Sequence, residues 1–258
     1  MKEILITNDD GFDSLGLIEL SSMLKKEFDV KITIIAPARE KSACSHSITL
    51  TKILKIIQIS QDFYKVEDGT PADCIYLALS VFYKDKLPDL VISGINHGAN
   101  LGEDITYSGT CGGAMEAVLH NIPAIALSQY YQNDEKKDEL NFTNSLKIIK
   151  KIIKNIFDNG FPLKQKEFIN INFPSAKIAF NGIKIAKAGK RIYKTQVESN
   201  TNPRGIKYYW LAVDTLEHIE EDSDISWIKK GYATITPIML DLTSYDSLNK
   251  MKNWIKKL

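Results

Sequence analysis

The sequence lacks the cysteine pairs, basic clusters and long apolar runs that mark several classes of protein. Its three cysteines are scattered and form no C-x-x-C pair, which favours reduced thiols in a cytosol. Acids and bases nearly balance at a net charge of +1, so no basic footprint for a nucleic acid polymer or an anionic membrane is present. No apolar run is long enough to span a bilayer or to form a secretion signal. We therefore expect a cytoplasmic protein that acts on a small soluble molecule.

Short β-branched strands alternate with amphipathic helices through the first two thirds of the chain, and the 44% hydrophobic content is ample for a core. This alternation predicts an α/β fold with a doubly wound, mostly parallel, Rossmann-like sheet. The expected strands are at 3–7, 31–35, 53–59, 89–93 and 123–127. The expected helices are at 15–28, 72–83, 110–120 and 141–157.

The pattern changes after Pro174, so we expect an α/β core that binds metal and phosphate over residues 1–175 and a C-terminal region over 176–258. Extended segments around a turn-rich stretch predict a long β-hairpin at about 183–213. A late strand then returns to the core, and a basic helix ends the chain.

The hairpin is aromatic, with Tyr208, Tyr209 and Trp210 in succession. An isolated two-stranded hairpin is marginally stable in water. We therefore expect it to pack on another subunit.

Two adjacent acids, Asp9 and Asp10, follow the first strand directly. Ligands of open α/β sheets bind outside the carboxyl ends of the strands. Neighbouring carboxylates repel each other there unless they share a proton or a cation. A helix cap is the alternative role, but it needs only one acid. The pair, with Gly11 and Asp13 behind it, favours a divalent cation site.

Two later segments carry polar groups to the same edge of the sheet. Asn96 follows another strand, where its amide oxygen suits a hard metal, although Asn and Gly in such a loop also serve simply as turn formers. Ser108, Gly109 and Thr110 stand at the start of the next helix, where N–H groups, hydroxyls and the helix dipole attract an anion such as phosphate. An ordinary Ser/Thr cap is the alternative there. A metal beside an anion site predicts phosphoryl transfer to water.

Other candidates for the chemistry are weaker. His46 and His97 are candidate acids or bases, although histidines in loops are more often solvated. Cys111 stands at a helix N-terminus, which favours a thiolate. A cysteine phosphatase needs an arginine a few residues later, and residues 112–117 contain none. We therefore expect Cys111 to be a small packed residue.

Four motifs in order along the chain resemble those of the SurE family, the stationary-phase survival protein nucleotidases; they occupy residues 6–11, 69–74, 93–96 and 107–110. The resemblance extends to residues 231–237 and so covers nearly the whole chain. It implies a 5'/3'-nucleotidase, a phosphoric monoester hydrolase that acts on nucleoside 5'- and 3'-monophosphates and, in some members, on short polyphosphate.

The resemblance also implies site residues and partners. It implies one divalent ion, Mg²⁺ or Mn²⁺, per subunit, held by Asp9, Asp10, Ser42 and Asn96, with Asp9, Asp10 and Asn96 as the catalytic residues. It implies phosphate binding by Asn100, Ser108, Gly109 and Thr110. It further implies a homodimer or homotetramer built through the C-terminal hairpin and helix. One departure from the family pattern is Ala38, where an aspartate is frequent.

Two alternatives stay open on the residues alone. A non-catalytic nucleotide-binding regulatory protein is the alternative function, although it needs no paired acids. Attack on phosphorus by a carboxylate is the alternative to attack by water, although the two-residue spacing of haloacid-dehalogenase-like acids is absent. A nicotinamide oxidoreductase is disfavoured because the first strand-to-helix turn lacks G-x-G-x-x-G.

Overall fold

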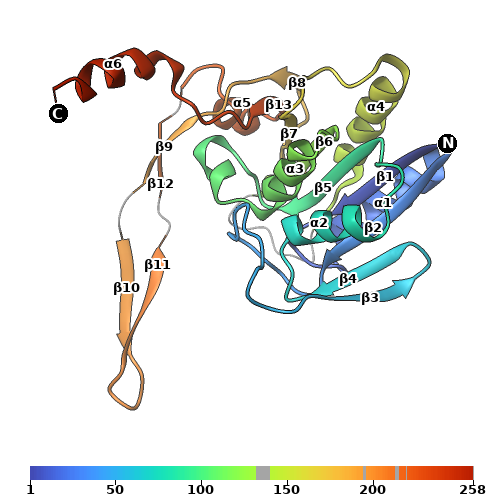
Figure 1. Cartoon of the computed structure of the whole chain (residues 1–258), viewed down its shortest axis with the longest axis horizontal. Helices are drawn as coiled ribbons and strands as arrows, with labels where there is room; N and C mark the ends of the chain where they lie inside the picture. The colour runs from blue at the N-terminus through green and yellow to red at the C-terminus, as the bar shows by residue number, and fades with distance from the viewer. Residues whose placement is uncertain (132–139, 194–195, 213–214, 219, 258) are drawn as a thin grey trace.

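The computed structural model describes residues 1–131, 140–193, 196–212, 215–218 and 220–257. Within them, a nine-stranded sheet has the order β3-β4-β2-β1-β5-β6-β7-β13-β8. Its strands are β1 (Lys2–Thr7), β2 (Val30–Pro37), β3 (Lys55–Ser60), β4 (Phe63–Glu67), β5 (Leu90–His97), β6 (Ala124–Gln129), β7 (Glu167–Phe173), β8 (Gly182–Ile185) and β13 (Tyr232–Met239). Neighbouring strands are parallel except in the pairs β3–β4 and β7–β13. The predicted mostly parallel α/β sheet is confirmed (Figure 1).

Helices cover both faces of this sheet. Helices α1 (Leu15–Glu27) and α4 (Thr143–Asn159) share one apolar core, and α2 (Pro71–Val81) and α3 (Gly109–Leu119) share the other. Strand β1 supplies both cores in alternation, because successive side chains of a strand point to opposite faces. Its Ile4 and Ile6 belong to the first core, whereas Leu5 belongs to the second. A strand that is apolar on both sides in this way occupies the centre of the fold.

The strand order reverses beside β1, which pairs with β2 on one side and with β5 on the other. Thr7, the last residue of β1, is in register with Ser93 of β5. The residues that follow β1 therefore begin beside Ser93, at the same edge of the sheet. This is the topological switch point, where open α/β sheets bind their ligands.

Strand β5 differs from its expected bounds. It was expected to end at Ser93, but it continues through a bulge to His97, so Asn96 lies in a strand and not in a loop. Gly94 adopts a φ of +133° at the bulge, and a Cβ there would lie 2.3 Å from the Leu127 carbonyl oxygen. Only glycine fits this position. The bulge bends β5, so its last residues run in a different direction from its first.

Five elements were not expected from the sequence: strands β4, β7 and β12 (Thr215–His218), the 3₁₀ helix η1 (Gly102–Thr106) and the short helix α5 (Asp224–Lys229). Strand β7 carries two asparagines, Asn170 and Asn172, that are fully buried. They interrupt the apolar run by which a buried strand is normally detected.

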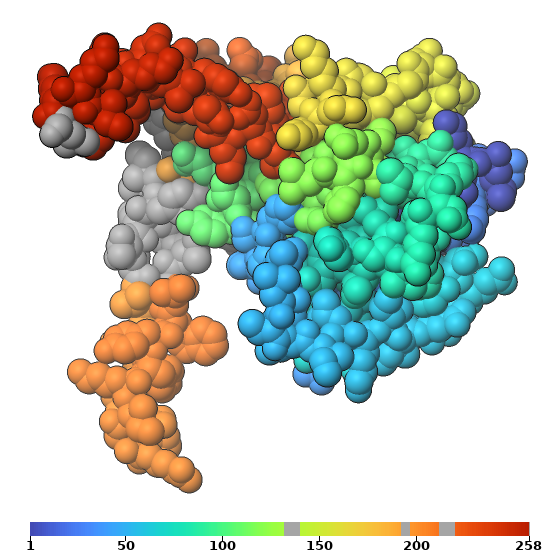
Figure 2. Space-filling model, in the orientation of Figure 1, coloured from blue at the N-terminus to red at the C-terminus, as the bar shows by residue number. Residues whose placement is uncertain are grey.

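Beyond the sheet, an antiparallel arm projects from the core (Figure 1). At its root, β9 (Lys190–Tyr193) pairs with β12 (Thr215–His218), and farther out β10 (Gln196–Thr201) pairs with β11 (Lys207–Ala212). The expected hairpin range is thus divided, because β8 at its start joins the main sheet and residue 213 at its end lies outside the described residues. Figure 2 shows the outer strands of the arm standing clear of the core.

The C-terminal helix α6 (Tyr245–Ile255) has no buried residue in the single chain. It also stands away from the core at the end of the chain (Figure 2). Among the described residues, no helix has the length and apolar character needed to cross a membrane.

The core of this fold yields a stability prediction. Phe168 of β7 is fully buried, whereas Phe180, in the loop before β8, is 40% exposed. We expect Phe168→Ala to lower the free energy of unfolding by about 3–5 kcal/mol, because it removes buried apolar surface and leaves a cavity. Phe180→Ala is the matched control and should cost about 1 kcal/mol or less. Urea unfolding of both variants measures the difference, and equal losses would contradict the assignment of Phe168 to the core.

Candidate active site

Asp9 leaves the end of β1 as a nearly buried carboxylate, 4% exposed. The hydroxyl of Thr110, at the start of α3, donates a hydrogen bond to its Oδ1. Burial, and next the charge of Asp10, raise the pKa of Asp9 to about 6, and the hydrogen bond from Thr110 acts against them. The ionised form of Asp9 is therefore disfavoured in the protein alone, and a nearby cation would favour it.

Asp10 is bound to the end of the neighbouring strand. The main-chain N–H of His97 donates to Asp10 Oδ2 at 3.0 Å, and the ring Nδ1 of His97 lies 3.7 Å from Asp10 Oδ1. The His97 ring also stacks on Phe142, with centroids 6.0 Å apart. The adjacent residue, Asn96, is buried and donates from its Nδ2 to the Gly98 carbonyl oxygen at 2.8 Å. The structure thus brings the acid pair and the Asn96 segment to one place.

Helix α3 points its N-terminus at Asp9. A Cβ on Gly109 would lie 3.0 Å from Asp9 Oδ2 and 2.7 Å from Cys44 Sγ, so only glycine permits this approach. Ser108 caps the helix, and its Oγ accepts the Cys111 N–H at 3.0 Å. The positive end of the helix dipole therefore lies beside the acids, which makes this turn suited to an anion.

Asn100 is held in place by polar groups on two strands. Its main-chain N–H donates to Asn172 Oδ1 at 2.8 Å, and its carbonyl accepts from Asn170 Nδ2 at 2.8 Å and from Asn172 Nδ2 at 3.0 Å. Its side-chain Nδ2 donates to Ser128 Oγ at 2.7 Å. Sequence reasoning missed Ser128, Asn170 and Asn172. The signal for the two asparagines was their alternation within an otherwise apolar strand.

Ser42 is placed less favourably than the other expected ligands. It is exposed, and its hydroxyl donates to Glu40 Oε1 at 2.7 Å and not to either aspartate. The N–H of the neighbouring Lys41, however, donates to the Asp9 main-chain carbonyl at 2.7 Å. The main chain at Ser42 therefore runs beside Asp9, although its side chain is engaged elsewhere.

The loop that carries Ser42 is fastened on its far side. Ser45 donates from its N–H to the Tyr107 carbonyl at 2.9 Å and from its Oγ to the Thr106 carbonyl at 2.6 Å. His46 lies 2.6 Å from Glu116 of α3, measured from Nε2 to Oε2, so its ring joins this helix and not the acid pair. These contacts tie the loop to the residues just before α3 and to the second half of the helix itself.

Cys111 is fully buried, as expected of a small packed residue. Burial raises the pKa of its thiol to about 12, which keeps it protonated and unreactive. Its Sγ lies 3.7 Å from Asn170 Oδ1. No thiolate of Cys111 therefore adds a negative charge to the start of α3, where a phosphate site is expected.

The chemistry of this donor set fits a hard divalent cation. Among the described residues, no group of three or more His, Cys, Asp or Glu side chains gathers as a soft or nitrogen-rich metal site would require. The switch point instead offers the oxygens of two carboxylates and of neighbouring amides, which magnesium and manganese prefer. One of these amides, Asn8, has a buried Oδ1 without a hydrogen-bond partner among the described residues.

Comparison with known proteins places this geometry in a family. The sequence model of the family described as survival protein SurE matches residues 4–195. The 5'-nucleotidase SurE of Campylobacter lari is 66% identical over 257 residues, which cover 99% of each chain. The 5'-nucleotidase SurE of Campylobacter fetus is 52% identical over 260 residues, covering 99% of this chain and all of the relative. The crystal structure of the SurE protein from Aquifex aeolicus superposes with a TM-score of 0.82 at 40% identity and covers 98% of this chain and 99% of its own.

The raised pKa of Asp9 predicts how stability depends on pH in protein stripped of metal. The pKa of an ordinary aspartate is 3.8, and that of folded Asp9 is about 6. Between these values the folded state binds more protons than the unfolded state, so the free energy of unfolding falls as pH rises through this window. Asp9→Asn should therefore raise the free energy of unfolding by about 2–3 kcal/mol near neutral pH and by much less below about pH 4.

Urea unfolding at both pH values, with a chelator present, measures this difference. Asp13→Asn removes an exposed acid of the same segment and should change stability little at either pH. If metal-free Asp9→Asn were no more stable than the parent protein at neutral pH, burial and the charge of Asp10 would not destabilise ionised Asp9 as we infer.

Proposed function

The chain belongs to the SurE family, and we propose that it releases phosphate from nucleoside 5'-monophosphates at the site around Asp9 and Asp10. The full-length identity to 5'-nucleotidases supports this phosphoric monoester hydrolase activity. The observation that carries it to particular residues is the contact between Thr110 and Asp9. It joins a buried acid pair to a helix N-terminus, so that a cation and a phosphate would lie side by side.

The family depends on a divalent metal in general. We assign one Mg²⁺ or Mn²⁺ per subunit to Asp9, Asp10, Asn96 and Ser42. When bound, such an ion polarises a phosphoryl oxygen and lowers the pKa of a bound water. Asn96 would contribute its amide oxygen, since its Nδ2 group already donates a hydrogen bond to the Gly98 carbonyl oxygen. Ser42 would join the set once its hydroxyl exchanges Glu40 for the ion, and its main chain is already beside Asp9.

The protein's own groups orient the two acids before any substrate arrives. The Thr110 hydroxyl holds one oxygen of Asp9, and the His97 N–H holds one oxygen of Asp10. A carboxylate accepts on both oxygens and at more than one lone pair of each, so both acids could contact a ligand while these bonds persist. Preorganised oxygens of this kind need little rearrangement when the charge on the substrate changes, which lowers the barrier of the reaction.

The phosphoryl group would be bound by Asn100, Ser108, Gly109 and Thr110. The Nδ2 of Asn100 has two hydrogens, one of which is donated to Ser128, so the other can reach a phosphoryl oxygen. Gly109 and Thr110 would contribute main-chain N–H groups of the first helical turn. We assign the Thr110 hydroxyl to Asp9, since it is already donated there. These donors would stabilise the negative charge that develops on the phosphoryl oxygens.

We extend the proposal to nucleoside 3'-monophosphates and short polyphosphate, because the recognised groups are the phosphate and the metal. A cytoplasmic location agrees with the three free cysteines.

The alternative, a non-catalytic nucleotide-binding regulator, is disfavoured by the buried acid pair. A pure binding site for an anion gains nothing from a second carboxylate beside the first.

We also propose a homodimer or homotetramer formed through the arm and helix α6. The outer strands of the arm expose Tyr209, Trp210 and Leu211 at 61%, 70% and 80%. Helix α6 exposes Met251 and Trp254, each at 55%. Apolar surface of this extent on elements that stand clear of the core indicates a protein interface.

The nucleotidase proposal predicts a metal-dependent release of phosphate. With AMP as substrate, we expect phosphate release that stops when metal is chelated and returns when Mn²⁺ is added. Asp9→Asn should lower kcat by at least about a hundredfold, since it removes a negative ligand from the metal. Asp13→Asn should retain the parent rate. A fully active Asp9→Asn variant would remove Asp9 from the mechanism, and activity that survives chelation would exclude the metal.

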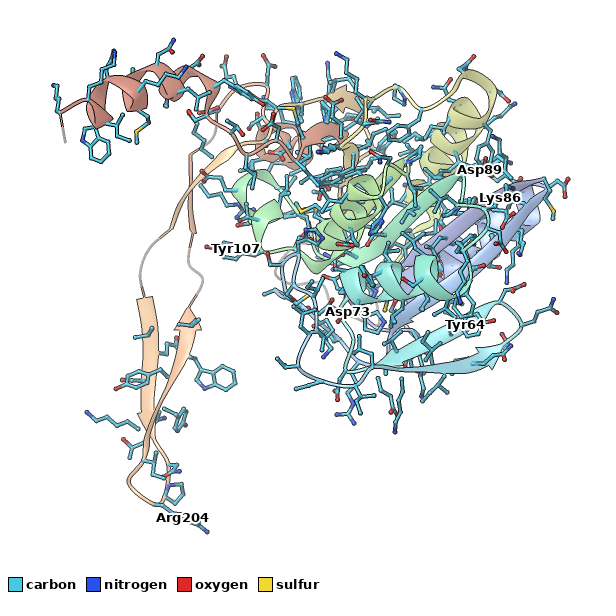
Figure 3. All side chains as sticks on the ribbon, viewed as in Figure 1. Tyr64, Asp73, Lys86, Asp89, Tyr107 and Arg204 are labelled. Carbon is cyan, nitrogen blue, oxygen red and sulfur yellow. The ribbon has the colours of Figure 1, made fainter. Side chains whose placement is uncertain are left out.

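The oligomer proposal predicts a change of mass in solution. Trp210→Asp introduces a charge on the exposed outer strand of the arm and should reduce the mass measured by light scattering toward that of one chain. Arg204→Ala, at the tip of the hairpin (Figure 3), is the matched control and should leave the mass unchanged. A parent protein that is already monomeric would refute the proposal.

A further inference from the structure

We propose that Asp224, a buried acid that the site described above does not include, is a positioning residue for phosphate binding. It would set the place of Asn100 and Ser108 by fastening the segment between them to the root of the arm. The inference rests on the proposed function, because it concerns the same phosphate site.

Asp224 joins three parts of the chain through one carboxylate. It is fully buried, and its Oδ2 accepts the Gly102 N–H at 2.8 Å. Its Oδ1 accepts the N–H groups of Gly189 and Ile225, each at 2.8 Å. Gly102 begins η1, Gly189 directly precedes β9 of the arm, and Ile225 belongs to α5. All three partners are N–H donors, so the position requires a group that only accepts.

The main chains meet here without intervening side chains. A Cβ on Gly102 would lie 2.4 Å from the Gly189 carbonyl oxygen, and a Cβ on Gly189 would lie 2.7 Å from Ile225 Cδ1. Two glycines 87 residues apart therefore allow η1 to lie directly on the root of the arm. Figure 3 agrees, because Tyr107, just past η1, lies on the side of the core that faces the arm.

A second contact reinforces the joint from the arm. Arg191 of β9 places its Nε 2.8 Å from Asp104 Oδ2, and its main-chain N–H donates to Glu103 Oε2 at 3.0 Å. Arg191 is largely buried, with 13% of its side chain exposed, so water screens this pair less than it would on the surface. Burial raises the pKa of Asp224, while the three N–H donors and then the charge of Arg191 oppose that effect.

The joint matters because of what lies at the two ends of η1. Asn100 stands two residues before Gly102, and Ser108 stands two residues after Thr106. Asn100 is bonded to β7 and Ser108 caps α3, and η1 is the short span that joins them. Releasing Gly102 from Asp224 would let this span move. The two acids would stay in place, since Thr110 and His97 hold them independently of η1.

Asp224→Asn tests this with little change of shape. An amide has one acceptor oxygen where the carboxylate has two, so its NH₂ group must face an N–H donor. We expect the KM for AMP and the Kd for inorganic phosphate, measured calorimetrically with Mg²⁺ present, to rise about tenfold, as the loss of a hydrogen bond to a charged group would produce. We expect kcat and the Mn²⁺ concentration for half-maximal activity to change by less than about threefold.

Glu220→Gln is the matched control. Glu220 is an acid at the same root of the arm, where it pairs with Lys187 and Lys190 and makes no described contact with η1. Phosphate affinity should stay at the parent value in this variant. If Asp224→Asn fails to fold, Arg191→Gln loosens the joint from the arm and should raise the phosphate Kd in the same direction.

The outcomes separate the two proposals. A parent protein that binds phosphate but does not release it from AMP refutes the nucleotidase proposal. The calorimetric measurement of the phosphate Kd then still tests whether Asp224 positions the phosphate site. An unchanged phosphate Kd in folded Asp224→Asn, or in Arg191→Gln where that variant replaces it, overturns the positioning role. Parallel losses of phosphate affinity, kcat and metal affinity also overturn it, because they indicate a general structural defect.

Discussion

The rest of the site is arranged around two neighbouring acids at the end of a buried strand. Asp9 is nearly excluded from water and lies beside the charge of Asp10, so its pKa rises to about 6. Without a cation this arrangement opposes folding, because burial and the charge of Asp10 make the ionised form of Asp9 costly. The arrangement becomes favourable only when a cation offsets the two charges. The cost of placing two carboxylates side by side with so little water is therefore the physical reason to expect a cation-binding function at this place.

The groups that donate hydrogen bonds to the two acids come from distant parts of the chain. Thr110 reaches Asp9 from the start of α3, and the His97 N–H reaches Asp10 from the end of β5. Both are brought near by the reversal of strand order beside β1. Gly109 then allows the helix to approach so closely that a methyl group in place of its hydrogen would collide with Asp9. The acid pair and the helix N-terminus proposed to bind phosphate thus meet in one contact.

The phosphate side of this contact extends to the arm. The η1 segment lies between the core and the root of the arm, and Asp224 and Arg191 join it to the latter. The arm, which we propose as a subunit interface, and the residues proposed to bind phosphate are therefore connected by a few short polar contacts. A change in the packing of the arm has a direct mechanical route to Asn100 and Ser108.

The sequence by itself determined the alternation of strands and helices, because apolar periodicity depends only on neighbouring residues. It also named Asp9, Asp10 and the Ser108 to Thr110 turn as site candidates, since strand ends and helix starts are local features. Strand β7 escaped detection because Asn170 and Asn172 hide its apolar pattern, and their role is visible only where they meet Asn100. The tertiary structure alone decided that Thr110 bonds to Asp9, that the Ser42 hydroxyl turns to Glu40, and that Asp224 joins Gly102 to Gly189. The Thr110 and Asp224 contacts link residues far apart in the chain, so their partners are set by packing that no local pattern encodes. The Ser42 hydroxyl lies two residues from Glu40, but the sequence does not specify that it turns there rather than toward Asp9.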